Sequence, residues 1–197
     1  MEINSLQELY LEQLKDLYDA EHQIIKALPK MIDKTESEEL KDALNEHLEV
    51  TREQASRIER IFSEMGEKAK AEKCKGMQGV IAEGDDLIGE IDDPKVRDAA
   101  IIAAAQRVEH YEMAGYGTAR TYAQLLGEEE AADLLQETLD EEKEADQKLT
   151  ELASELNVEA EEGGEEEAAQ ESRTAKSGRT ARSTSSSSTS RRKKRVA

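Results

Sequence analysis

Acidic side chains interrupt the apolar stripes of three stretches of the chain that have helical spacing. Glu21 takes the central position of a stripe of leucine and isoleucine in the first stretch. Glu109 and Glu112 share one face of a later stretch, and Glu142 and Asp146 lie on the stripe of the last. Residues three or four apart lie on one side of a helix, so these carboxylates are expected to face the interior. Glu112 and Asp146 could instead stand behind the others and orient them.

A histidine interrupts the apolar stripe of the remaining stretch, where His47 and Thr51 fall among leucines. A carboxylate that is buried without a partner is costly. The nearest basic residue, Arg107, is two positions from Glu109 and therefore points to another side of the helix. Hard divalent or trivalent ions, which bind carboxylate oxygen and imidazole, would supply the missing positive charge. Bundles with carboxylates and histidines on facing helices hold dinuclear iron or manganese in this way.

Other polar residues near these stripes have simpler interpretations. His22 and His110 each follow a candidate ligand directly, which turns them about 100° around the helix, towards the surface or an interface. Tyr18 and Tyr116 could donate to a metal-bound oxygen or relay an electron, or pack with their hydroxyls satisfied. Cys74 has no cysteine or histidine near it in sequence and is expected to be inert.

Four long helices are predicted to carry these residues. The first begins at Ser5, which forms a capping box with Glu8, and is expected to kink or break near Pro29. The second opens with a further capping box, Thr35-Glu36-Ser37-Glu38, and ends at about Gly66.

The second half of the chain repeats this organisation after a long connection. A short, weak helix is expected around residues 77–91 of that connection. The third helix starts with Asp93 as its cap and Pro94 as its first residue, and it ends at Gly127. The fourth helix is predicted from about Glu128 to Leu156.

The composition favours one all-α domain. Proline occurs only twice, tryptophan is absent, and 37% of the 197 residues are charged. No apolar run approaches the roughly 20 residues that span a bilayer, so no membrane partner is expected. The N-terminus lacks the pattern of a secretory signal, and a single cysteine fits a reducing compartment. We therefore expect a cytoplasmic protein.

Charge and composition change after residue 158. Residues 159–197 contain seven acidic and nine basic residues and so carry a net charge of +2. Because the whole chain has a net charge of −19, residues 1–158 carry −21. That acidity repels nucleic acid and anionic membranes. The last segment is first rich in Glu, Gly and Ala, then rich in serine, and ends in a basic cluster at 191–195. Because it has no apolar periodicity, we expect residues 1–158 to form the bundle and residues 159–197 to be a disordered tail.

Four groups of motifs, one from each predicted helix, together resemble a known family. They are Asp19-Ala-Glu21 followed by Lys26-Ala-Leu-Pro-Lys30, His47-Leu-Glu-Val-Thr51 with Gln54, Val108-Glu-His-Tyr-Glu112 with Tyr116-Gly-Thr118, and Thr138-Leu-Asp-Glu-Glu142 with Asp146-Gln-Lys-Leu149. Residues 1–158 resemble the YciE/YciF family of ferritin-like proteins, a bacterial stress-associated group for which ferroxidase activity has been suggested.

The resemblance implies a fold, an assembly and a site. The fold is an all-α, ferritin-like four-helix bundle, the assembly a homodimer, and the metals two iron ions or an iron and a manganese ion. The implied ligands are Glu21, His47, Glu109, Glu112, Glu142 and Asp146. One departure is visible: the wider superfamily places Glu-x-x-His on its second and fourth helices, and neither copy is present here, which puts the number of metal ions in question.

The function expected from these features is oxidation of Fe(II) by O₂ or peroxide, which would limit oxidative damage. Two alternatives remain open. The bundle could be a non-catalytic interaction or dimerisation module in a stress response. The chain could also protect nucleic acid, with weak phosphate contacts made by the basic tail at residues 172–197.

Overall fold

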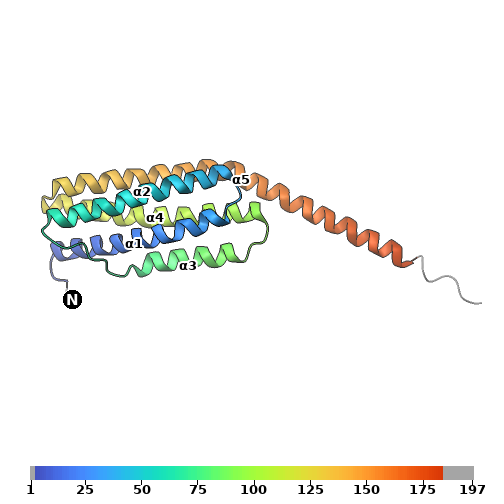
Figure 1. Cartoon of the computed structure of the whole chain (residues 1–197), viewed down its shortest axis with the longest axis horizontal. Helices are drawn as coiled ribbons and strands as arrows, with labels where there is room; N and C mark the ends of the chain where they lie inside the picture. Colours follow the sequence, from blue (N-terminus) through green and yellow to red (C-terminus); the bar gives the residue numbers. More distant parts are fainter. Residues whose placement is uncertain (1–2, 184–197) are drawn as a thin grey trace, which may run out of the picture.

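The computed structural model describes residues 3–183 of the chain, with side chains described as far as residue 162. The described residues form helices and connecting segments without any β-strand, which confirms the all-α prediction. Four helices are long, and a fifth, shorter helix lies in the connection between the second and third long ones (Figure 1). Their bounds are α1 (Leu6–Lys34), α2 (Glu38–Glu64), α3 (Lys75–Gly89), α4 (Pro94–Leu126) and α5 (Glu129–Ser183).

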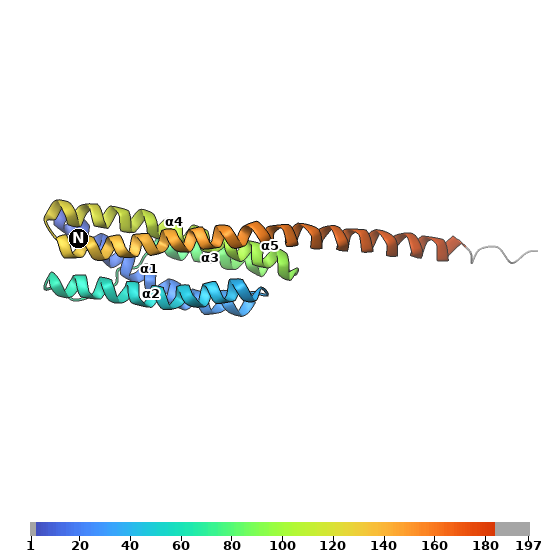
Figure 2. The ribbon, with the colours of Figure 1, turned by 90° about the horizontal axis from the view of Figure 1, so that it is seen from above.

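The long helices pack as two hairpins that lie side by side. Helices α1 and α2 form the first hairpin and α4 and α5 the second, while α1 also packs on α4 and α2 on α5. Each long helix therefore has two long neighbours around one shared interior (Figures 1 and 2). Helix α3 lies outside this square, against α4 and α1. Two hairpins joined by one long crossover are the ferritin-like form of the four-helix bundle, as predicted.

Capping side chains set most helix starts where the sequence predicts them. The Ser5 hydroxyl accepts a hydrogen bond from the backbone N–H of Glu8 at 3.1 Å, and the Asp93 carboxylate accepts one from Val96 at 2.9 Å. Gly127 ends α4 in the left-handed region, at a φ of 80°. Such a residue satisfies the last carbonyls of a helix without the steric cost of a side chain.

Two predicted helix boundaries differ from the structure. The cap of α2 is Ser37 and not Thr35, because the Thr35 hydroxyl donates to the carbonyl of Met31 at 2.8 Å and so belongs to the end of α1. Helix α1 also continues through Pro29 to Lys34 instead of breaking there.

The largest difference lies at the end of α5. This helix was expected to end near Leu156, but it continues to Ser183 and projects beyond the bundle (Figures 1 and 2). Residues 159–183, for which we expected disorder, are therefore helical. Alanine and glutamate are strong helix formers and no proline follows Leu156, so local propensity supports a helix without an apolar stripe. Residues 184–197 lie outside the described part of the chain.

The apolar interior is divided into two clusters along the bundle. One contains Ile24, Leu44 and Ile101, and the other contains Leu14 and Phe62. The gap between the clusters is widest in α2, between Leu48 and Ile58, and in α5, between Leu139 and Leu149. That separation defines a polar layer across the middle of the bundle. Within residues 3–183, no helix is both long enough and apolar enough to cross a membrane.

Candidate metal centre

The polar layer consists of buried side chains from all four long helices. Each helix places them where its apolar stripe is interrupted. The layer contains Glu21 of α1, His47, Thr51 and Gln54 of α2, Glu109 and Glu112 of α4, and Glu142 of α5. All except His47 are at most 2% exposed, and the His47 side chain is 10% exposed. The sequence prediction that these acidic side chains face the interior is thus confirmed for all of them but Asp146.

Four of these residues form a compact group of potential ligands. His47, Glu109, Glu112 and Glu142 each offer one nitrogen or oxygen atom, and these atoms all lie within 4.8 Å of one another. The Nε2 atom of His47 lies 3.3 Å from Oε1 of Glu109. Because the group joins α2 to α4 and α5, it lies between the two hairpins.

Neighbouring side chains hold parts of this layer in place. The Gln54 amide donates a hydrogen bond to Oε1 of Glu142. The Tyr116 hydroxyl, itself fully buried, donates to Oε1 of Glu21. The Thr51 hydroxyl donates its proton to the backbone carbonyl of His47 at 2.7 Å, so that proton is not available to the group.

Many polar atoms of the layer have no hydrogen-bond partner. The atoms are Oε2 of Glu21, Nε2 of His47, Oε1 of Gln54, Oε2 of Glu109, both carboxylate oxygens of Glu112, and Oε2 of Glu142. Buried polar atoms are rarely left unpaired, and several together at one place call for an ion or water.

Positive side chains do not compensate this layer. Among the described residues, no lysine or arginine forms an ion pair with Glu21, Glu109, Glu112 or Glu142. The Arg57 guanidinium acts to lower the pKa of Glu21, but burial outweighs it. Arg57 pairs instead with carboxylates at the edge of the bundle, 3.0 Å from Glu137 and within 2.7 Å of Glu141.

The ionisation of the layer reflects its burial. Burial raises the pKa of Glu21 well above its usual range, and the nearby charge of Glu142 adds to the effect. Burial also raises the pKa of Glu109 and of Glu112, followed by the influence of neighbouring carboxylates. Burial lowers the pKa of His47, which favours the neutral imidazole. Without a cation, this layer therefore retains protons, whereas a bound ion would displace them.

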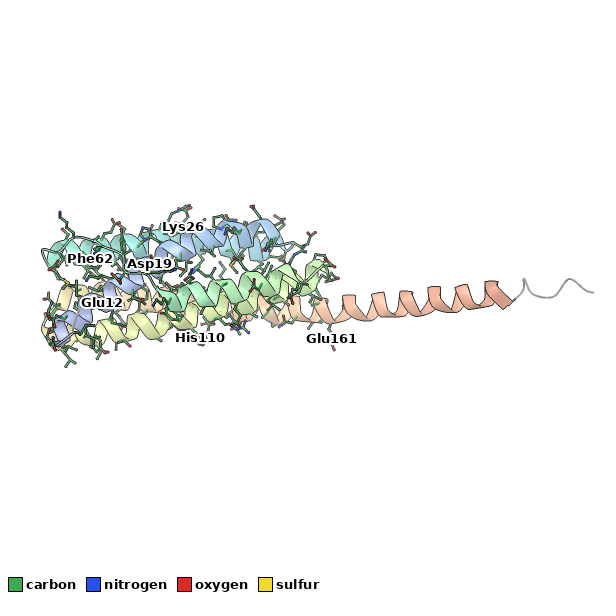
Figure 3. All side chains as sticks on the ribbon, turned by 90° about the horizontal axis from the view of Figure 1, so that it is seen from below. Glu12, Asp19, Lys26, Phe62, His110 and Glu161 are labelled. Carbon is green, nitrogen blue, oxygen red and sulfur yellow. The ribbon has the colours of Figure 1, made fainter. Side chains whose placement is uncertain are left out.

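Asp146 differs from the other predicted ligands. Its Oδ1 atom accepts a hydrogen bond from Gln106 at 3.0 Å and lies 3.3 Å from Nε2 of His110. The Asp146 side chain is 24% exposed and His110 is 66% exposed, on the outer side of the bundle (Figure 3). The structure thus places Asp146 outside the compact group, and His110 lies at the surface as predicted.

The remaining polar residues considered in the sequence have structural partners. Tyr18 donates to Glu59 at 2.5 Å, and Nδ1 of His22 lies 2.8 Å from the carbonyl of Tyr18. Cys74 is buried at the start of α3, with its sulfur 3.1 Å from Oδ2 of Asp16. These contacts give it a place in the packing of α3 that its neighbours in sequence did not indicate.

Gln54 is the member of the layer whose contact sequence reasoning missed. A signal was present, because Gln54 continues the interior series 47, 51 and 54 between the apolar positions of α2. Because an amide carries no charge, its place on the stripe does not by itself indicate a bound cation.

The chemistry of this layer suits a divalent cation. Three carboxylates and one neutral imidazole form a mixed oxygen and nitrogen donor set, which iron and manganese accept. The unpartnered atoms of Glu109, Glu112, Glu142 and His47 are the ones such an ion would use. The described residues therefore include an acidic and histidine cluster that could hold a metal ion.

Comparisons with known proteins give a consistent result. The model of a domain of unknown function, DUF892, matches residues 5–162. Protein YciF of Escherichia coli K12 is 46% identical over 154 residues, which cover 78% of this chain and 93% of YciF. The crystal structure of the Escherichia coli stress protein YciF matches with a TM-score of 0.76 at 44% identity, over 79% of this chain and 99% of that one. YcfI of Rhodopseudomonas palustris matches with a TM-score of 0.75 at 44% identity, over 76% and 95%. These matches confirm the resemblance to the YciE/YciF family.

Proposed function

The chain belongs to the family described as domain of unknown function DUF892, and on that premise we propose that it binds two iron ions inside the bundle and oxidises Fe(II). The observation that carries this proposal is the set of unpartnered buried atoms in the polar layer. In the metal-free chain, retained protons keep the repulsion between these carboxylates low, but only while the carboxylates stay un-ionised. Cations remove both the repulsion and the unmet bonding capacity.

The ligands divide into two sets by their present partners. His47, Glu109, Glu112 and Glu142 form the compact group and would hold the first ion. Glu21 shares a hydrogen bond with Tyr116 and leaves Oε2 free. It would hold a second ion together with Glu112, whose two oxygens are both unpartnered. Manganese is the alternative occupant, because it accepts the same donors.

Oxidation of the bound Fe(II) would supply electrons to O₂ or peroxide. The protein's own residues would keep the site dry and fix the ligands: Gln54 holds one oxygen of Glu142, and Tyr116 holds one oxygen of Glu21. The protons retained by the raised-pKa carboxylates would leave as the ions bind. The Escherichia coli relative is called a stress protein, and we extend that role to this chain as protection against oxidative damage.

A non-catalytic role is the second candidate, and the donor set itself favours it. A single histidine is present in the layer, and Gln54 contributes an amide where a carboxylate could have stood. Both features weaken binding of a second ion. In this case the bundle would bind metal without turnover and serve as an interaction module.

Anaerobic titration with Fe(II), followed by admission of O₂, separates these candidates. We expect two ions to bind per chain and O₂ consumption to follow. The variant Glu109→Gln combined with Glu142→Gln should lose both, while Asp146→Asn, which alters the partly exposed carboxylate beside Gln106, should keep them. Binding without O₂ consumption would support the non-catalytic role. Unchanged binding in the double variant would refute the site.

Homodimer formation and nucleic-acid contact through residues 172–197 remain predictions. Sedimentation of the full chain tests the first. A DNA mobility shift that is lost at high salt, and on removal of residues 172–197, tests the second.

A further inference from the structure

Two cavities reach the metal-binding group from different sides of the bundle. The first lies between α2 and α5 and has a volume of about 160 Å³. The second lies where α3 covers α1 and α4 and has a volume of about 30 Å³. His47 and Glu109 line both cavities, so both end at the same two candidate ligands. In Figure 1, α2 and α5 lie along the upper edge of the bundle and α3 along the lower edge.

The opening between α2 and α5 is acidic. Glu46 of α2 and Glu141 and Glu144 of α5 line it, and Lys148 is the single basic residue among its lining residues. Lys148 forms an ion pair with Glu46 across the two helices, with side chains 50% and 68% exposed. Glu141 is paired with Arg57, so the uncompensated negative charge among these three glutamates is that of Glu144, which attracts cations. His47, whose Nε2 atom has no hydrogen-bond partner, also lines this cavity.

The cavity beneath α3 has the opposite character. Its walls are mostly apolar side chains of α1, α3 and α4, among them Ile24, Val80 and Val108, with Asp85 of α3 as a charged exception. Its volume is about that of one water molecule. An ion would lose its hydration there with a single carboxylate, Asp85, along the way to replace it, whereas a small uncharged molecule has no such hydration to lose. Glu109 and His47 stand at its inner end.

We propose that the site has two separate entrances: cations arrive through the acidic opening between α2 and α5, and uncharged diatomic molecules arrive through the apolar cavity beneath α3. This proposal rests on the proposed metal site, but it does not require that the site be catalytic. The two entrances would let a bound ion meet a small oxidant without either reactant displacing the other from a shared path.

The cation entrance is tested by the rate at which Co(II) binds, measured by stopped-flow absorbance at low ionic strength. The variant Glu144→Gln removes one negative charge from the opening and should slow association several-fold, because electrostatic steering raises association rates by 10-fold or more. Lys148→Gln removes the positive charge and should speed association. Glu155→Gln, an exposed position 11 residues further along α5, is the control and should change nothing. Both effects should shrink at high salt.

The results divide cleanly. If wild-type protein fails to bind Co(II), the proposed metal site is wrong. If it binds but Glu144→Gln and Lys148→Gln associate at the wild-type rate, the site stands and the cation entrance is refuted. Because both side chains are at the surface, neither substitution should disturb the fold.

The second entrance is tested with nitric oxide, an uncharged diatomic molecule that binds Fe(II) without turnover. Val80→Phe should fill the cavity beneath α3, and Val50→Phe should narrow the opening between α2 and α5. In protein loaded with Fe(II) under anaerobic conditions, we expect Val80→Phe to slow nitric oxide binding at least threefold and Val50→Phe to leave it unchanged. For the rate of Co(II) association the opposite is expected: Val50→Phe should slow it and Val80→Phe should leave it unchanged.

Equal effects of the two variants on nitric oxide would refute separate entrances. The circular dichroism spectrum and the stoichiometry of metal binding show whether each variant is folded. A variant that binds the full amount of Co(II), but more slowly, tests the entrance. A variant that binds less Co(II) than wild type has a disturbed site and is replaced by the smaller change Val80→Leu or Val50→Leu.

Discussion

Raising the pH should destabilise the metal-free protein, and Glu112 should account for a measurable part of the loss. The pKa of Glu112 is raised in the folded chain by burial and by the charges of Glu21, Glu142 and Glu109. In the unfolded chain its pKa returns to about 4.3. Between these two values the folded chain holds a proton that the unfolded chain has released. The contribution of this group to stability is therefore complete below about pH 4.3 and is lost as the pH rises through the folded-state pKa.

The magnitude follows from the number of retained protons. Each proton held only by the folded state lowers the free energy of unfolding by about 1.4 kcal/mol per pH unit. Glu21 and Glu109 behave in the same direction as Glu112, so the combined slope is steeper than that of a single group. Glu112→Gln keeps the shape of the side chain but cannot ionise. It should reduce the slope by up to about 1.4 kcal/mol per pH unit.

Urea unfolding of chelator-treated protein at several values between pH 5 and 8 measures this slope. The variant should have nearly wild-type stability at pH 5 and exceed it increasingly towards pH 8. Glu155→Gln, an exposed change of the same chemistry, should run parallel to wild type. The reasoning is refuted if the curves of Glu112→Gln and wild type run parallel, because Glu112 would then titrate alike in the folded and unfolded chains.

Three further results are expected. A divalent ion that binds the site, at a concentration of about 100 times its dissociation constant, should increase the free energy of unfolding by about 2.7 kcal/mol. The expected rise in Tm is about 5–10 °C, measured by calorimetry with and without chelator. Tyr116→Phe should lower the free energy of unfolding by about 1–3 kcal/mol in the metal-free protein, measured in urea, because Oε1 of Glu21 loses its donor. A loss below about 0.5 kcal/mol would contradict that. Gly127→Ala should cost about 1 kcal/mol, seen as a Tm lowered by about 2–4 °C, because alanine is strained at a φ of 80°, and an unchanged Tm would count against it.

Residue types and spacing were enough to predict the four helices and the interior position of most candidate ligands. Polar residues at the centres of apolar stripes are costly unless they have partners, so Glu21, Glu109 and Glu142 could be placed inside from periodicity alone. The same argument failed for Asp146, which shares a stripe with Glu142 but lies one turn along. Some positions on a helical stripe lie at the edge of the interface, where a side chain can turn inward or outward. The hydrogen bond from Gln106 shows which way Asp146 turns, and the sequence does not contain that information.

Competition between local signals explains the other differences. Thr35 and Ser37 each carry a hydroxyl that could cap the start of α2. The sequence does not show that Thr35 instead bonds to the end of α1 and leaves Ser37 as the cap. The end of α5 was missed because apolar periodicity reports packing, whereas the helix beyond residue 158 follows from local propensity. The two cavities depend on how α3 packs on α1 and α4 and how α2 packs on α5. Residue spacing within one helix does not determine that packing.

For the proposed metal site, the order of the candidate ligands along the chain decides when the protein could acquire metal. Glu142 is the last member of the compact group and belongs to the last helix, so a nascent chain lacks a full set of ligands until α5 has been synthesised and has docked. Under the proposed function, ions would enter only a finished bundle, and the amount of metal bound would report the fraction of chains in which both hairpins have come together.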